Sequence, residues 1–203
     1  MKKFTKILGI CILLAALVWL GSVVADRRYL NEHVIRLHVV ANSDSREDQQ
    51  LKLQVRDAVT AWLADAADPQ MTARQAAVWL SDQLPRLERV AKDAAAAAGW
   101  QGEVSVSFGK EAFPIREYET FTLPAGVYQS LRIGIGESQG KNWWCVVFPS
   151  LCLPATSEDF RDTAAGAGFS DSLSGALSDG RTYEVRFFLL DWLGRLENFL
   201  FRK

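Results

Sequence analysis

Histidine and cysteine, the side chains that most often serve as base and nucleophile at neutral pH, are scarce in this chain. Histidine occurs only as His33 and His38, and Cys145 lies in an apolar strand pattern. His38 and Cys145 would form a catalytic pair only if the cysteine could ionise to a thiolate. A disulfide at Cys145 would exclude that chemistry. A Ser-His-Asp triad needs a serine on a defined elbow, and we expect no G-x-S-x-G elbow in this chain.

Acidic residues and glycines could build two other kinds of site. Asp44, Asp48 and Asp57 are candidates for paired carboxylates or a calcium site, but the segment lacks the glycine and the distal glutamate of an EF-hand loop. Helix capping explains these residues more simply. The glycines between 134 and 140 precede a strand and predict a hairpin loop, not a phosphate cradle. We therefore expect no catalytic residue, no metal site and no cofactor.

A strand, a cap and a helix follow one another after residue 34. Alternation from Ile35 to Ala41 predicts a strand with one buried face and one less buried face. Asn42 to Ser45 supply capping side chains, and Ser45 with Asp48, or Asp44 with Glu47, has the spacing of a capping box. The apolar residues that follow recur at helical spacing and indicate an amphipathic helix: Leu51, Val55, Ala58, Val59, Trp62 and Leu63.

The rest of the domain is predicted as one further helix and a set of strands. Thr72 and Gln75 cap a helix that extends to about residue 98, with a kink or break near Gln83 because Pro85 removes a backbone donor. Two-residue periods with short connections then predict an antiparallel meander. We expect an α+β domain at 34–191, an antiparallel sheet with two long helices packed on one face. Its strands are placed at 104–108, 113–121, 127–135, 142–148 and 183–189.

Two segments near the C-terminus differ from their surroundings. Residues 156–181 are rich in Ser, Asp, Ala and Gly, which predicts a mobile loop that Phe160 and Phe169 could hold to the domain. Residues 192–203 predict a short amphipathic C-terminal helix. That helix could cover the core, lie on a membrane surface or dock on a partner.

The N-terminal segment predicts export of the domain. Lys2, Lys3 and Lys6 precede an uncharged run from residue 7 to residue 25. Residues 1–25 are therefore a signal peptide cleaved after Ala25, or a membrane anchor, and residues 26–33 a short linker. Either alternative places the domain outside the cytoplasm, because the lysines favour a cytoplasmic N-terminus.

Charge and cysteine content agree with an exported domain. Without residues 1–25 the chain keeps 20 basic and 24 acidic side chains, which argues against nucleic-acid binding. Cys11 lies in the apolar segment, so Cys145 and Cys152 are the cysteines of the domain. Their separation allows a disulfide across the turn between them, and two reduced, buried thiols are the alternative.

Three blocks of the sequence resemble the stage II sporulation protein R family of spore-forming bacteria. The first is RLHVVANSDS, continued by DQQLKLQVRDAV, and the second is LPAGVYQSLRIGIGESQGKNWWCVVFPSLC. The third, YEVRFFLLDW, is similar to the family's last strand. Their order and spacing agree, so the resemblance covers residues 34–191.

The resemblance implies a function that the residues alone do not indicate. Members of this family are signals that the forespore exports into the intermembrane space. The exported protein is either released as a secreted protein or stays anchored in the membrane by its N-terminal segment. There they trigger a membrane-embedded aspartic protease of the mother cell, stage II sporulation protein GA, which processes the sigma-E precursor. The resemblance thus implies a protease activator and not an enzyme. Such an activator binds the active form of its partner more tightly than the inactive form.

We predict the partner surface from the family blocks. It comprises the polar corner Asn42, Ser43 and Asp44, the neighbouring Arg56, and Trp143 or Trp144. The two tryptophans face opposite sides of their strand; core is the expected place for both, and a surface position would let one anchor a partner.

Two other classes of function remain open. A wall-associated binding module could stack sugars on exposed aromatic side chains, and a pull-down on peptidoglycan would test it. A cryptic hydrolase would use Asp44, His38 or Glu117, so that alanine substitutions there would abolish signalling.

Overall fold

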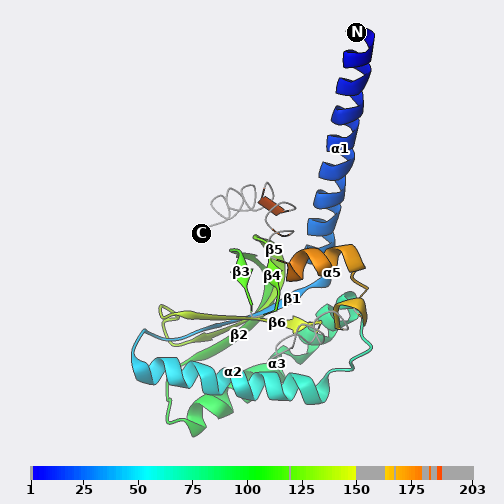
Figure 1. Cartoon of the computed structure of the whole chain (residues 1–203). Helices are drawn as coiled ribbons and strands as arrows, with labels where there is room; N and C mark the ends of the chain where they lie inside the picture. Colours follow the sequence, from blue (N-terminus) through cyan, green and yellow to red (C-terminus); the bar gives the residue numbers. More distant parts are fainter. Residues whose placement is uncertain are drawn as a thin grey trace.

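The computed structural model describes residues 2–118, 120–149, 163–166 and 168–179, together with residues 183, 187 and 188. A four-stranded sheet forms its centre, and two long helices cover one face of that sheet (Figure 1). This arrangement confirms the α+β class and the packing of both helices on one side. The sheet order is β2-β5-β1-β6, with bounds β1 (Ile35–Val40), β2 (Val104–Phe113), β5 (Gly126–Ile135) and β6 (Asn142–Phe148).

The place of β1 in the sheet differs from the predicted meander. β1 pairs parallel with β5 and antiparallel with β6, so it lies between two strands that are consecutive in this part of the chain. All six of its residues are buried, including Arg36 and His38, which the alternation placed on a less buried face. A central strand has both faces covered, so its polar side chains need partners inside the protein.

Helices α2 (Arg46–Ala66) and α3 (Ala73–Ala97) begin at the predicted caps. The Ser45 side chain accepts a hydrogen bond from the backbone N–H of Asp48, and Thr72 forms a capping box with Gln75. Pro85 lies inside α3, which continues without a break. Both helices pack on the odd-numbered side chains of the central strands in one buried cluster, which includes Leu37, Val39, Val55, Val59, Leu80, Leu87, Leu131 and Ile133.

A second buried cluster fills the opposite face of the sheet. It joins Phe113 and Tyr128 of the strands to the final turns of α1 (Lys2–His33) and to α5 (Asp171–Ser178). The expectation of a mobile loop at 156–181 is therefore wrong for its described part. Small side chains let α5 approach closely, and Phe169 is buried as expected, whereas Phe160 lies outside the described residues.

The predicted strand at 183–189 is also wrong where the structure describes it. Tyr183, Phe187 and Phe188 are helical, and the N–H of Tyr183 donates to the carbonyl of Asp179 at 2.8 Å. Tyr183 and Phe187 are buried in the second cluster, so their apolar spacing serves a helix packed on this face. The predicted C-terminal helix at 192–203 lies outside the described residues. A separate two-stranded sheet pairs β3 (Arg116–Glu117) with β4 (Thr122–Leu123).

Helix α1 projects from the domain as a long rod that ends at the start of β1 (Figure 1). Within the described residues it is the one helix long and apolar enough to cross a membrane. The residues expected as a linker, 26–33, are its last two turns, so no flexible connection separates the apolar segment from the domain.

Candidate functional site

The corner between β1 and α2 contains the predicted polar residues, and it holds two loops together. Asn42 and Ser43 both donate hydrogen bonds to the Asp48 carboxylate, and the pKa of Asp48 is lowered, first by Ser43 and then by Asn42. The backbone N–H of Glu137 donates to Asn42 Oδ1 at 3.0 Å. These bonds are directed inward, so the side chains of Asn42 and Ser43 stabilise the corner instead of presenting free donors to a partner.

Asp44 and Lys52 secure the other end of the same loop. The N–H of Lys141 donates to Asp44 Oδ1 at 2.7 Å, and Lys52 Nζ donates to the Lys141 carbonyl at 3.0 Å and to Gln49 Oε1. Lys52 is only 5% exposed, and this burial lowers its pKa. The corner is thus a rigid junction between β1, α2 and the β5–β6 connection.

Gly140 lies where this junction is tightest. A Cβ at Gly140 would meet the Ser43 carbonyl oxygen, a backbone atom that cannot turn away. We expect Gly140→Ala to lower the free energy of unfolding by about 2 kcal/mol, because the backbone must move to admit a methyl group. Urea unfolding of the full chain in detergent measures the change. Gly109→Ala is the matched control, since no atom lies within 4 Å of a Cβ there, and an equal loss in both variants would contradict the argument.

Arg56 and Trp143 form the part of the predicted surface that reaches solvent, although the Arg56 side chain is only 20% exposed. The Arg56 guanidinium carbon lies 4.2 Å from the centroid of the Trp143 ring, and Arg56 also pairs with Asp57. The Trp143 side chain remains 37% exposed. A cation stacked on an accessible indole is a pre-ordered apolar and charged patch, the type of contact that frequently dominates a protein interface.

Trp144 lies on the opposite face and is separate from this patch. Its ring stacks on His38 with centroids 3.8 Å apart, and it meets Phe113 edge-on at 4.8 Å. The predicted contact residues therefore divide into a structural corner, one partly exposed pair and one packed tryptophan. Sequence alone established that the two tryptophans diverge, but not which one reaches solvent.

A charged network that the sequence did not reveal surrounds His38. Glu111 on β2 accepts hydrogen bonds from His38 Nδ1 at 2.8 Å, from Arg132 at 2.9 Å and from Ser130 at 2.9 Å. His38 Nε2 lies 2.8 Å from Asn142 Oδ1. Register brings these residues together from four strands, β2, β5, β1 and β6. Burial alone would raise the pKa of Glu111, but the hydrogen bond and charge of His38, with Ser130 and Arg132, lower it.

Arg36 lies two residues before His38 on β1, in an aromatic environment. Its guanidinium carbon lies 4.0 Å from the Phe113 ring and 5.0 Å from the Tyr128 ring, and Nη2 donates to the Tyr118 hydroxyl at 3.0 Å. Arg36 is 0% exposed, and its Nε and Nη1 have no hydrogen-bond partner among the residues that the structure describes. Stacking on two rings offsets part of the cost of burying this charge.

Cys145 and His38 do not form the catalytic pair considered above. Cys145 packs in the helix-covered cluster, whereas His38 lies on the other face of the sheet, and Cys145 is disulfide-bonded. A bonded cysteine has no thiolate to act as a nucleophile. Its predicted partner, Cys152, lies outside the described residues, so the pairing of these two cysteines stays a prediction.

The expectation that the chain has no G-x-S-x-G spacing is wrong. Gly136 to Gly140 reads GESQG, which has the G-x-S-x-G spacing of a nucleophile elbow, and Ser138 has a positive φ of 53°. An elbow presents its serine between a strand and a helix, whereas this turn joins β5 to β6. His38 Nδ1 lies against Glu111 and Nε2 lies against Asn142, so neither ring nitrogen of His38 faces Ser138 as a triad would require.

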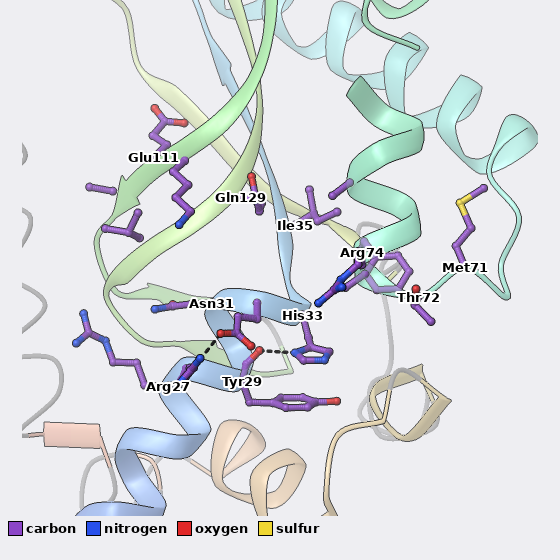
Figure 2. Close-up of a pocket in the computed structure, with 18 of the residues that line it drawn as sticks. Arg27, Tyr29, Asn31, His33, Ile35, Met71, Thr72, Arg74, Glu111 and Gln129 are labelled. Carbon is purple, nitrogen blue, oxygen red and sulfur yellow. Dashed lines mark hydrogen bonds and ion pairs between the residues drawn. The ribbon is translucent and has the colours of Figure 1, made fainter. Parts of the chain in front are cut away.

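A groove opens where α1 enters the domain. It encloses about 1450 Å³ between the end of α1, the start of α3 and the β2–β5 pair. Figure 2 shows Arg27, Asn31 and His33 on the α1 side, Thr72 and Arg74 on the α3 side, and Glu111 and Gln129 on the strands. Within the described chain no three His, Cys, Asp or Glu side chains gather as they would around a metal ion.

Comparison with known proteins identifies the family. The model of the family described as stage II sporulation protein R matches residues 31–158. The chain belongs to this family. It is also 33% identical over 188 aligned residues to stage II sporulation protein R of Bacillus subtilis strain 168, covering 81% of this chain and 82% of that relative. No solved structure matches it. The chain is thus a member of a sporulation family, and its corner, network and α1–domain junction lie within or next to the matched residues.

Proposed function

We propose that this family member is an exported intercellular signal of endospore formation. Its domain binds the membrane-embedded aspartic protease of the mother cell, stage II sporulation protein GA, and favours the form that processes the sigma-E precursor. Membership of the stage II sporulation protein R family carries this proposal. An activator needs only differential affinity for two states of its partner, so it requires no catalytic residue of its own.

Two structural features support this proposal. Helix α1 has the length and apolar composition of a signal or membrane segment, as an exported protein requires. The Arg56–Trp143 pair, hereafter the contact pair, provides an exposed indole with a half-buried cation stacked on it, beside a rigid corner. A rigid contact loses little conformational entropy on binding, so more of its interaction energy can shift the protease toward one state.

Reconstitution in a non-sporulating host tests the proposal. The full chain is co-expressed with the candidate protease and a tagged sigma-E precursor, and the length of the precursor is followed by immunoblot. We expect the shortened sigma factor only when all three proteins are present. An intact precursor, in cells where the domain is shown to be exported and folded, would contradict the proposal.

A control separates an activator from a hydrolase. The same assay is repeated with the catalytic aspartate of the protease replaced by asparagine, which should abolish processing. Persisting processing would mean that the chain itself cleaves the precursor, and alanine substitution of Asp44, His38 or Glu117 would then test the hydrolase candidates.

A further inference from the structure

Arg36 is a fully buried cation whose hydrogen-bond partner is neutral. Its Nη2 donates to the Tyr118 hydroxyl at 3.0 Å, and within the described residues its Nε and Nη1 have no hydrogen-bond partner. Two other buried side chains that can carry a positive charge differ from it: Lys52 donates to two oxygens, and His38 lies against the Glu111 carboxylate. Buried polar groups are normally hydrogen-bonded, and a buried charge without a counter-charge is costly. The unused donors of Arg36 therefore indicate a ligand.

The described part of the domain supplies no carboxylate to Arg36. Glu111 lies on the same face of the sheet, since its strand position and that of Arg36 both face even-numbered residues of β5. Its oxygens, however, already accept hydrogen bonds from His38, Arg132 and Ser130. A counter-charge for Arg36 must come from another molecule.

Arg116 on β3 brings a second guanidinium to the same aromatic cluster. Residues two apart in an extended segment point to the same side, so Arg116 lies on the side of β3 from which Tyr118 reaches Arg36. Its guanidinium carbon lies 5.2 Å from the Trp144 ring centroid, and that ring meets Phe113, over which Arg36 stacks. Arg116 Nε is also buried and has no hydrogen-bond partner among the described residues. Two cations with unused N–H donors around one cluster are suited to an anion.

We propose that Arg36 and Arg116 form a binding site for one carboxylate group. Guanidinium groups bind carboxylates through short, charge-assisted N–H···O bonds. The Phe113 and Tyr128 rings close the space around Arg36, so a flat carboxylate with a single charge suits the site better than a bulkier phosphate, whose desolvation costs more. Arg116 and Tyr118 are only half-buried, so these side chains move aside to admit the ligand. The carboxylate then replaces the Tyr118 hydroxyl as the partner of Arg36.

Acetate binding tests the proposal. The midpoint of thermal unfolding of the full chain in detergent is measured while sodium acetate replaces sodium chloride at constant ionic strength. A ligand that binds only the folded protein raises this midpoint, and we expect a rise of about 4 °C at an acetate concentration about tenfold above the dissociation constant. Arg116→Gln should lose most of the rise, because it removes one of the two guanidinium groups. An unchanged midpoint in the wild type would overturn the proposal.

Arg86→Gln is the matched control for the loss of charge. Arg86 also lies beside an indole, 5.8 Å from the Trp62 ring centroid, but it is exposed and belongs to α3 on the helix-covered side of the sheet. The acetate-dependent rise in this variant should stay within about 1 °C of the wild-type rise. Equal rises in the wild type and in Arg116→Gln would show a nonspecific salt effect and contradict the site.

The same assay distinguishes two sources of the carboxylate. A short peptide with blocked ends and one glutamate is compared with acetate and with the same peptide carrying glutamine. Binding of the glutamate peptide at least about tenfold more tightly than acetate would assign the site to an acidic side chain of a protein partner. Equal affinity would assign it to a small carboxylate anion. If the glutamine peptide bound as tightly as the glutamate peptide, the site would not recognise a carboxylate.

Nuclear magnetic resonance shows whether the ligand reaches Arg36. In isotopically labelled full chain, the Nε–H signal of Arg36 is identified by its contacts with the Phe113 and Tyr128 rings. Acetate should shift this signal and that of Arg116 over the concentrations that raise the midpoint, and should leave the Arg86 signal in place. A raised midpoint without a shift of the Arg36 signal would place the acetate elsewhere and overturn the proposal. These measurements do not involve the protease, so failure here is distinguishable from failure of the proposed function.

Discussion

Glu111→Gln is expected to lower the free energy of unfolding by about 3 kcal/mol near pH 7. The carboxylate accepts three side-chain hydrogen bonds, from His38, Arg132 and Ser130. An amide of the same shape can accept only through its single oxygen and brings an NH₂ group against one of these donors. Removing one member of a partly buried charged network commonly costs a few kcal/mol, because the remaining groups stay desolvated. Urea unfolding of the full chain in detergent measures the loss.

The loss should depend on pH in one direction. The pKa of Glu111 in the folded protein lies below its ordinary value of 4.5, because the bonds and charge of His38, with Ser130 and Arg132, outweigh the opposing effect of burial. A group with a depressed folded pKa stabilises the protein above its unfolded pKa, and this contribution disappears as the pH falls through the folded pKa. The difference between wild type and Glu111→Gln should therefore be full at pH 7 and shrink progressively below about pH 4.5.

Glu117→Gln is the matched control for both parts of this prediction. Glu117 lies on β3 and is exposed, so the same change of charge should alter the free energy of unfolding by less than about 0.5 kcal/mol at any pH. If the two variants lost equal stability, or if the Glu111→Gln deficit were constant from pH 7 to pH 3, the network would not be stabilised by an ionised Glu111.

Alanine substitution of the two adjacent tryptophans should separate signalling from stability. Trp143→Ala removes an exposed ring from the contact pair, and we expect processing of the sigma-E precursor to fall at least about tenfold, as for a central interface residue. Trp143 is 37% exposed, so the unfolding free energy should change by no more than about 1 kcal/mol. Initial rates in the reconstituted assay, normalised to exported protein, measure the first effect.

Trp144→Ala should show the opposite balance. Its ring stacks on His38 and contacts Phe113, so removing it leaves a cavity on the second face and should cost about 3 kcal/mol of stability. Arg56→Gln provides the companion variant, since it keeps a polar side chain but loses the charge stacked on Trp143. Unchanged processing in both Trp143→Ala and Arg56→Gln would exclude the contact pair as the surface that the protease recognises.

Local features of this protein were determined by short stretches of sequence. Ser45 and Thr72 begin α2 and α3 because their hydroxyls accept bonds from backbone N–H groups three residues later. The apolar spacing after each cap selected the helix faces that reach the core, and the run from residue 7 to residue 25 indicated a membrane segment. These signals depend on groups a few residues apart, so they can be read without knowing the fold.

The candidate site depended on contacts between distant segments. Glu111 and Asn142 both contact His38, although they lie 73 and 104 residues away from it in the sequence. Nothing in the local sequence pattern predicts these contacts. The insertion of β1 between β5 and β6 decides these contacts, buries Arg36 and turns Trp143 outward and Trp144 inward.

Tertiary packing also reversed two local expectations. The small residues of α5 suggested a mobile loop, yet the same residues allow close approach to the aromatic cluster. The alternation at 183–189 suggested a strand. The described residues of this segment are helical instead, and Tyr183 and Phe187 are buried in the second cluster. Sequence thus determined where helices start and which segment is apolar, because those depend on neighbouring groups. Strand order and burial were decided only by the tertiary structure, because they depend on which distant surfaces exclude water together.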